Sequence, residues 1–168
     1  VFMFKSKFKV FFFIVFFTST LFENEVNLNQ NHVYFFPKQA DEAKDKIVEL
    51  IANSKDTIKI SMYNFSYKKF AKELVEASKK GVKIQVILDE KKVEEDDEIY
   101  KYLKKNDIEI IISKKKLHTK IAIFDNKIAL IGSLNWTKES FEENYESLLM
   151  SNNKEIIADI DNFFINFN

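Results

Sequence analysis

The sequence predicts a single α/β domain in which a mixed β-sheet is flanked by helices on both faces. Short apolar segments rich in β-branched residues alternate with longer amphipathic segments, which is the pattern of a sheet covered by helices. A polar turn at 125–127 joins two of the apolar segments, so the sheet should contain an antiparallel hairpin. The 168 residues, 46% of them hydrophobic and 15% aromatic, fit one packed domain rather than a disordered chain.

The expected elements follow one another in a regular order. Each expected strand is rich in β-branched residues or alternates in polarity, and each expected helix repeats apolar residues every three or four positions. Gly81 stands where a helix would end, at the position that favours glycine. The expected strands are 33–36, 57–63, 82–88, 108–112, 119–124, 128–131 and 145–150, and the expected helices are 41–53, 68–80, 93–105 and 156–167.

The first 22 residues differ in composition from the rest. Three lysines precede the apolar run 10–17, which is typical of a secretory signal peptide, and the run is shorter than the roughly 20 residues of an ordinary spanning helix. We expect residues 1–22 to be a signal peptide or an N-terminal membrane anchor, with a buried strand or helix as the other interpretation. Residues 23–31 then form a linker, and 32–168 form the catalytic domain. The protein is expected to be exported, either periplasmic or secreted, with membrane association through 8–22 if that segment is retained.

Charge and cysteine content limit the classes of function. The chain has 26 basic and 26 acidic residues, and without residues 1–22 it has 23 basic residues against 26 acidic ones. A general nucleic-acid binder would be basic, so recognition of a polyanion must be local, and Lys114–Lys116 is the candidate patch. The same lysine run can equally be a solvated strand end. With no cysteine and two histidines, we expect no metal site and no cofactor.

Residues 118–135 carry the chemistry. If 119–124 is a strand, then His118 and Lys120 lie on one side of it, while Ile121 and Ile123 point to the core on the other. An imidazole and an ammonium are thus presented side by side on a rigid element. This pair predicts an anion site that contains a titratable nucleophile or base.

Further polar residues accompany this pair. Gly132 lets backbone amides approach an anion, and Ser133 and Asn135 offer side-chain donors beside it. Glu146 is a candidate to accept from the second imidazole nitrogen and so hold the tautomer. For Asp125, at the turn, we favour hydrogen bonds that fix the hairpin.

This motif resembles a known one. HTKIAIFD, GSLN and the downstream Asn144-x-Glu146 are similar to the HxK(x)4D(x)6GSxN signature of the phospholipase D superfamily. The similarity extends back through YFFP, KISMYNFSYKKFAKELVEA and KKGVKIQVILDE, and covers about residues 30–150. These segments resemble the small bacterial members with one motif per chain, of the exported endonuclease type.

The resemblance implies roles for the motif residues. His118 matches the nucleophile that attacks phosphorus and forms a phosphohistidine intermediate. Lys120 and Asn135 match the ligands of the phosphate oxygens, with Ser133 as polar support, and Glu146 matches the carboxylate that orients the histidine. The family needs no metal and no cofactor.

A two-step displacement also needs an acid for the leaving oxygen. The other histidine, His32, has no motif around it and is expected at the surface. We therefore expect the second imidazole to be His118 of a partner chain across a two-fold axis, in a homodimer with one shared active site. The resemblance makes Asp125 the structural aspartate of the catalytic motif.

Three aromatic residues near the motif have two interpretations each. Tyr63 and Phe65 are placed to wall the site and stack on bases, but in a chain with 18 phenylalanines we favour core packing for both. Trp136 is expected to pack under the motif rather than to contact substrate.

Three functions compete. The leading one is a metal-independent phosphodiesterase that acts as a non-specific endonuclease on DNA or RNA. The second is a phospholipase D or cardiolipin hydrolase that acts on membrane phospholipids, which an uncleaved N-terminal segment would favour. The third is a binding module without turnover, which the intact motif disfavours.

Overall fold

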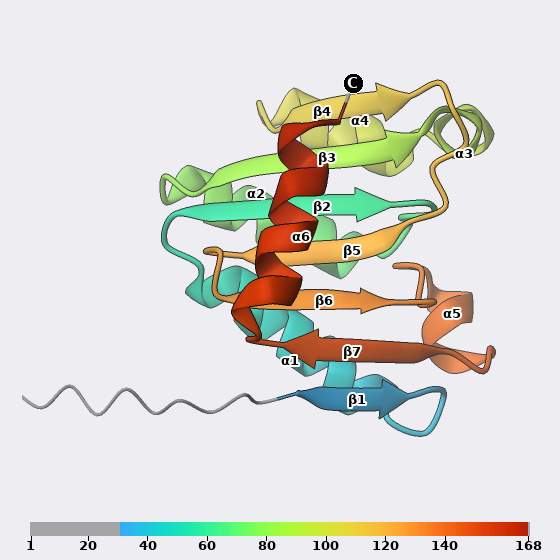
Figure 1. Cartoon of the computed structure of the whole chain (residues 1–168). Helices are drawn as coiled ribbons and strands as arrows, with labels where there is room; N and C mark the ends of the chain where they lie inside the picture. The colour runs from blue at the N-terminus through green and yellow to red at the C-terminus, as the bar shows by residue number, and fades with distance from the viewer. Residues whose placement is uncertain (1–30, 168) are drawn as a thin grey trace, which may run out of the picture.

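Seven strands form one mixed sheet in the order β1-β7-β6-β5-β2-β3-β4 (Figure 1). The structure is a computed structural model that describes residues 31–167. The strands are β1 (His32–Phe35), β2 (Thr57–Met62), β3 (Lys83–Asp89), β4 (Glu109–Ser113), β5 (Lys120–Phe124), β6 (Ile128–Gly132) and β7 (Ser147–Ser151). Strands β2, β3 and β4 are parallel to one another, whereas β5, β6, β7 and β1 join the sheet through antiparallel pairs. The expected mixed sheet with its β5–β6 hairpin is confirmed.

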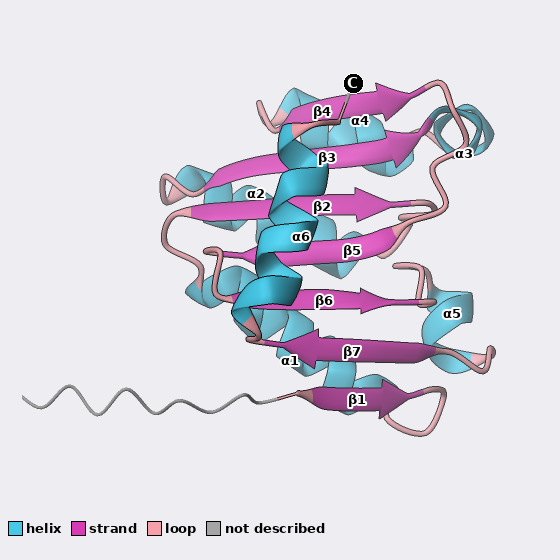
Figure 2. Ribbon diagram, viewed as in Figure 1, coloured by secondary structure: helices cyan, strands magenta, loops and turns pink. Residues whose placement is uncertain are grey.

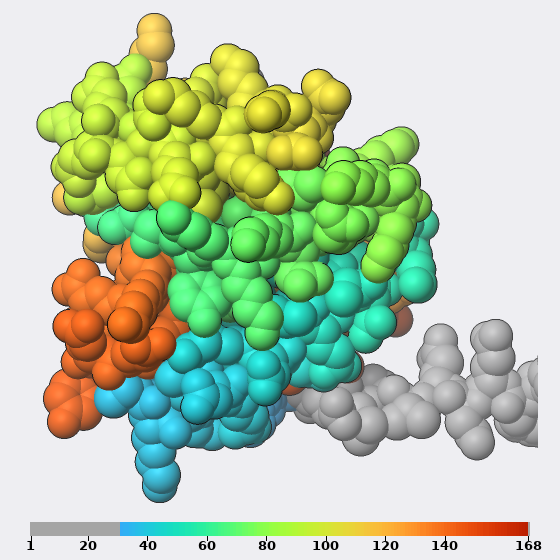
Figure 3. Space-filling model, turned by 180° about the vertical axis from the view of Figure 1, so that it is seen from behind, coloured from blue at the N-terminus to red at the C-terminus, as the bar shows by residue number. Residues whose placement is uncertain are grey.

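Helices cover both faces of this sheet, as Figure 2 shows. They are α1 (Ala40–Asn53), α2 (Lys68–Lys79), α3 (Glu90–Glu95), α4 (Glu98–Lys105), α5 (Lys138–Glu142) and α6 (Lys154–Ile165). Helix α6 crosses the front face in Figure 1, while α1, α2 and α4 cover the back face, which Figure 3 shows from behind. The expected α/β fold is therefore confirmed. No helix among residues 31–167 is long and apolar enough to span a membrane. The expected signal or anchor segment 1–22 lies outside the described residues, as does the linker except for Asn31.

The sheet separates two hydrophobic cores. Along β5, Ala122 and Phe124 belong to the larger core under α1 and α2, and Ile121 and Ile123 belong to the smaller core under α6. Both faces of β5 are therefore buried, because helices lie on both sides. The alternation was predicted correctly, but the strand begins at Lys120 rather than at 119. His118 thus lies in the loop before the strand.

Two helical segments differ from the sequence-based expectation. The single helix expected at 93–105 is two helices, α3 and α4, which are interrupted at Asp96 and Asp97. Asp96 is extended and its carboxylate accepts from the backbone N–H of Glu98, so a short side chain competes with the helical hydrogen-bond pattern. Helix α5 was not expected. The sequence feature that marks the start of this helix is Thr137. Its hydroxyl caps the helix by accepting from the backbone N–H of Ser140.

Part of the face that carries α6 is left uncovered by the described helices. Cross-strand pairing aligns Ile121 of β5, Ile131 of β6, Leu149 of β7 and Val33 of β1 in one row on this face, and Phe35 lies beside the row. Val33, Phe35 and Ile131 are exposed, and Leu149 is half-buried. We call Val33, Phe35, Ile131 and Leu149 the apolar row. An exposed, contiguous apolar surface of this kind marks an interaction site.

Candidate active site

The motif residues other than Asp125 gather at the edge of the sheet where β2, β3 and β6 end and β5 and β7 begin, the right-hand edge in Figure 1. His118 precedes β5, and its side chain is exposed. The centroid of its ring lies 4.7 Å from that of Tyr63, in an edge-to-face arrangement. Within residues 31–167 no hydrogen bond of the imidazole is formed, so both ring nitrogens are available to a substrate or a partner.

Lys120 lies beside this imidazole as the sequence predicts. The lysine is only 7% exposed. Its Nζ donates to the backbone carbonyl of His118 at 3.2 Å and lies 4.8 Å from the centroid of the Tyr63 ring. Burial lowers the pKa of Lys120, and the nearby Glu146 carboxylate opposes this shift. The ammonium is thus fixed next to His118, with few protein acceptors to neutralise it.

The charge of Lys120 acts on the histidine. It is the largest cause of a lowered pKa at His118, with smaller contributions from partial desolvation and from Lys116. Asp89 acts in the opposite direction. A lowered pKa keeps the imidazole neutral to more acidic pH. A neutral imidazole retains the lone pair that nucleophilic attack requires.

We expect a Lys120→Gln variant to raise the pKa of His118 towards its ordinary value, because the largest cause of the downward shift is removed. The acid limb of the activity profile should then move to higher pH. Proton NMR titration of the ring protons measures this shift directly, since the chain has two histidines and a His32→Gln variant assigns the signals. An unchanged pKa of His118 would show that Lys120 does not tune it.

Gly132 has a packing role that the sequence did not indicate. A Cβ at this position would lie 2.1 Å from the carbonyl oxygen of Ser147, in the backbone of β7. The missing side chain therefore allows β6 and β7 to approach each other. The close approach fixes the end of β6 against the start of β7, where Glu146 lies.

Ser133 and Asn135 lie just after the end of β6, at the same edge of the sheet as His118. The Ser133 hydroxyl accepts from the backbone N–H of Ser147 at 3.1 Å and keeps its own proton to donate. Asn135 is held because the next residue, Trp136, bonds through its backbone to the segment after β2. The Oδ1 atom of Asn135 is buried and has no hydrogen-bond partner among the described residues. A buried amide without a partner is costly, and a bound ligand would satisfy it.

The carboxylate of Glu146 affects Lys120 rather than His118. It raises the pKa of Lys120, but it is not among the groups that shift His118, and no hydrogen bond joins the two side chains. Within one chain, the expected contact between Glu146 and the imidazole is therefore absent from the described structure. The acid neutralises part of the lysine charge at the same edge of the sheet.

Asp125 lies at the other end of β5 from His118. Its carboxylate accepts from the backbone N–H groups of residues 55, 56 and 57 at 2.9, 2.8 and 3.0 Å. Burial alone would raise its pKa, but these three hydrogen bonds outweigh burial and the pKa is lowered. The structural role was expected, although its bonds tie the hairpin to the segment before β2 instead of closing the hairpin itself.

The sequence did not indicate a role for Asp89, and it placed Tyr63 in the core. The buried carboxylate of Asp89 accepts from the backbone N–H groups of Lys92 and Leu117, so it joins α3 to the residue before His118. The available signal was its position at the carboxyl end of β3, at the same edge of the sheet as the start of β5. Tyr63 was assigned to the core, but it is half-exposed against His118. Phe65 and Trp136 do belong to the core, as expected, and their rings pack edge to face.

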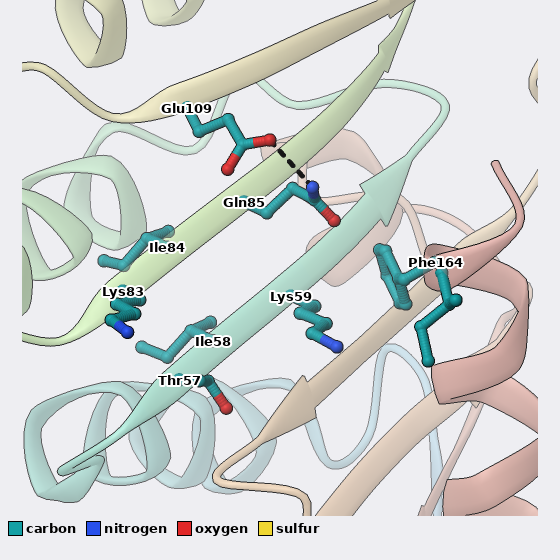
Figure 4. A pocket seen from close by; sticks show the side chains of 9 residues that line it. Thr57, Ile58, Lys59, Lys83, Ile84, Gln85, Glu109 and Phe164 are labelled. Atoms are coloured by element: carbon teal, nitrogen blue, oxygen red, sulfur yellow. Dashed lines mark hydrogen bonds between the residues drawn. The ribbon is translucent and has the colours of Figure 1, made fainter. Parts of the chain in front are cut away.

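Two hollows lie at opposite ends of the parallel strands. One, of about 420 Å³, borders the site and is lined by Tyr63, Lys114 and Lys116 among others. The other, of about 360 Å³, lies where β2 and β3 begin, beside the end of α6 (Figure 4). Gln85 and Glu109 are hydrogen-bonded to each other in its wall. The first hollow shares Tyr63 with the site, since the Tyr63 ring contacts His118, and it lies at the carboxyl ends of the parallel strands, where α/β sheets bind ligands.

The other histidine cannot complete the site within one chain. His32 lies in β1, the edge strand, and its Nε2 is 3.9 Å from a carboxylate oxygen of Glu42 in α1. Strands β7 and β6 separate β1 from β5 in the sheet. Its side chain is 44% exposed, so the expected surface location is approximately correct. Among residues 31–167 the site therefore contains one imidazole, that of His118.

Comparison with known proteins identifies similar domains. The family model described as "Cardiolipin synthase, PLD-like domain" matches residues 47–167. The mitochondrial cardiolipin hydrolase of Xenopus tropicalis is 23% identical over 119 residues, which are 70% of this chain and 57% of that protein. The chain thus spans less than two thirds of that relative's length.

Two solved structures share the fold. NucT from Helicobacter pylori superimposes with a TM-score of 0.74 and 26% identity, covering 80% of this chain and 92% of that one. The phospholipase D family member Nuc from Salmonella typhimurium superimposes with a TM-score of 0.73 and 23% identity, covering 82% and 92%. Both similarities extend over nearly the whole of the other chain.

Proposed function

The chain belongs to the family of phospholipase D-like domains, and on this premise we propose that it is a metal-independent phosphodiesterase whose substrate is DNA or RNA. The observation that carries the proposal is the pairing of an exposed His118, whose pKa is lowered, with a buried Lys120. A neutral imidazole next to a fixed ammonium is suited to attack a phosphodiester whose negative charge the ammonium offsets.

The proposed reaction has two displacements. A ring nitrogen of His118 attacks phosphorus and forms a P–N bond, while the P–O bond to the leaving group breaks and a second imidazole donates a proton to the leaving oxygen. Water then attacks phosphorus and gives its proton to the second imidazole, and the P–N bond breaks. Lys120 and Asn135 bind the phosphate oxygens in both steps. Asn135 does so through its amide N–H groups, since its unpaired Oδ1 is an acceptor and cannot bond to a phosphate oxygen.

We assign the second imidazole to His118 of a partner chain, in a homodimer. The apolar row supports this assignment, since it is uncovered by the described helices and reaches the edge of the sheet that carries the site. A second copy packed on it through a two-fold axis would bury the same residues of both chains. It would also bring two copies of the site towards each other. Glu146 has no bond to His118 of its own chain, so the dimer is also where that carboxylate would meet an imidazole.

Nucleic acid is favoured over lipid by the charge around the site. Lys114–Lys116 and Lys92 lie near Tyr63 and His118, whereas the domain as a whole is not basic. Local cations of this kind suit a polymer with a phosphate at every residue. Residues 1–22 have the pattern of an export signal, and export to the periplasm or beyond remains part of the proposal.

A phospholipase activity is the second candidate, and one observation favours it. Matching relatives include mitochondrial cardiolipin hydrolases, and the family model carries a cardiolipin name. Cardiolipin contains phosphodiesters, so the same His118 chemistry would apply to it. An N-terminal segment that stays in the membrane would place the domain at such a substrate.

Substrate preference can be measured on the purified protein. Plasmid DNA, RNA and cardiolipin vesicles are each incubated with it in the presence of a chelator. We expect both nucleic acids to be cut and the vesicles to be hydrolysed more slowly or not at all. Preferential lipid hydrolysis would move the assignment to the second candidate, and loss of every activity in chelator would contradict the metal-independent mechanism. A protein that binds these substrates without cutting any of them would be a binding module.

A further inference from the structure

The hollow beside His118 is polar and is formed by three parts of the chain. Tyr63, at the end of β2, forms one wall, and Lys91 of α3 forms another. Ser113, the last residue of β4, forms the third with Lys114 and Lys116, which follow that strand. Its volume of about 420 Å³ lies within the range of sites that bind small molecules, which is about 300–1,000 Å³. The hollow extends the site sideways from the point where the scissile phosphate would bind.

Its lysines are free to bind a ligand. Lys91 and Lys114 are exposed, and neither has an ion pair with a carboxylate among residues 31–167. Asp89 also lines the hollow, but both of its carboxylate oxygens already accept backbone hydrogen bonds. Glu90 is the remaining acidic group in the lining. The unpaired charge is therefore mainly positive and is suited to an anionic group.

Tyr63 adds an aromatic surface between the hollow and the nucleophile. Its ring is half-exposed, meets the His118 ring edge to face, and has the ammonium groups of Lys92 and Lys116 at 5.4 and 6.0 Å from its centroid. Lys116 is exposed and has a long side chain, so its ammonium group can move away from the Tyr63 ring when a flat ligand binds there. An aromatic ring bordered by cations is the arrangement that binds single-stranded nucleic acid, since the bases stack and the phosphates pair with the lysines.

We infer that this hollow binds the nucleotide next to the scissile phosphate in a single-stranded polynucleotide. Lys91 and Lys114 bind the neighbouring phosphate, and an unpaired base stacks on Tyr63. The inference rests on the proposed nuclease function and narrows the substrate from nucleic acid in general to single strands. A base in a duplex is already stacked and paired, so its face is not available to Tyr63. A phospholipid would place an acyl-bearing glycerol beside its phosphate, and a polar, lysine-lined hollow does not suit it.

The lysines are tested with a double variant, Lys91→Gln with Lys114→Gln, on a single-stranded oligonucleotide over a range of salt concentrations. The two lysines together neutralise one phosphate, so the double variant should reduce the slope of log(kcat/KM) against log[salt] by about 0.7. The matched control is Lys72→Gln with Lys80→Gln, which removes two exposed lysines of α2 and its end that form no ion pair within residues 31–167. A slope equal to that of the control would overturn the assignment of these lysines.

Tyr63 is tested by comparing leucine and phenylalanine at this position. Tyr63→Leu removes the ring and should lower kcat/KM for a single-stranded oligonucleotide on the order of tenfold relative to an abasic oligonucleotide of the same length, which has no base to stack. Tyr63→Phe keeps the ring, so the ratio of the kcat/KM values for the two substrates should stay close to that of the wild type. An equal loss on both substrates would mean that Tyr63 only supports His118, and would overturn the stacking role.

Failure of this inference can be told from failure of the proposed function. If the wild-type protein cuts nucleic acid but prefers duplex over single-stranded DNA, the single-strand assignment is wrong and the nuclease function stands. If the wild-type protein cuts lipid and not nucleic acid, the proposed function itself is wrong. Both comparisons use the unmodified full chain.

Discussion

A His118→Ala variant is expected to lose phosphodiesterase activity by about 10³-fold or more, because the nucleophile and, in the dimer, the acid are both removed. The side chain is exposed and forms no hydrogen bond within the described residues, so its loss should not unfold the protein. Turnover of bis(p-nitrophenyl) phosphate measures the chemistry without the contribution of the hollow. Circular dichroism confirms that the variant is folded.

His32→Ala is the matched control for this experiment. It removes the other imidazole of the chain, which lies in β1 near Glu42. Two strands, β7 and β6, separate β1 from β5. We expect it to retain wild-type turnover. Rapid quenching of the wild-type reaction should also yield a phosphate adduct on the peptide that contains His118. A His118→Ala protein with activity close to that of wild type would disprove the site.

Ile131→Glu is expected to convert the dimer to monomers and to lower activity by about 10²-fold or more. Ile131 belongs to the apolar row and is 38% exposed in the single chain, so a carboxylate there is tolerated by the monomer but would be buried without a partner in the dimer. Activity should fall in proportion to the fraction of dimer that is lost, since each chain contributes one imidazole to the site. Light scattering coupled to size-exclusion chromatography gives the mass, and the same fractions are assayed.

Tyr102→Glu is the control for this substitution. Tyr102 lies on α4, on the other face of the sheet, and is 37% exposed, so the new charge and the exposure match those at position 131. This variant should stay dimeric and active. If Ile131→Glu remained dimeric, the apolar row would not be the interface. If it became monomeric with full activity, the shared site would be wrong.

Much of the fold could be predicted because its signals are local. The alternation along 119–124 predicted that Ile121 and Ile123 share a face, and the turn at 125–127 predicted the hairpin, since both depend on neighbouring residues. Placement of Lys120 beside His118 also followed from spacing alone, because two positions along an extended chain return to the same side. The motif itself identified the family.

What could not be predicted depends on contacts between distant segments. The backbone of β7 explains Gly132, and residues 55–57 explain Asp125, yet neither partner is near in sequence. Tyr63 was assigned to the core by composition, but the loop that carries His118 leaves it half-exposed. The break at Asp96 was missed because the apolar spacing continues across it. In each case a long-range or side-chain contact outweighed the local pattern.

The shared site is the central claim, and subunit exchange tests it most directly. Equal amounts of wild-type and His118→Ala chains are unfolded together and refolded, and the activity is compared with that of the two proteins refolded separately and then mixed. Random pairing leaves about one quarter of the dimers with two histidines, so the exchanged sample should have about half the activity of the separate sample. Equal activity in the two samples would show that one chain works alone, and would contradict the account.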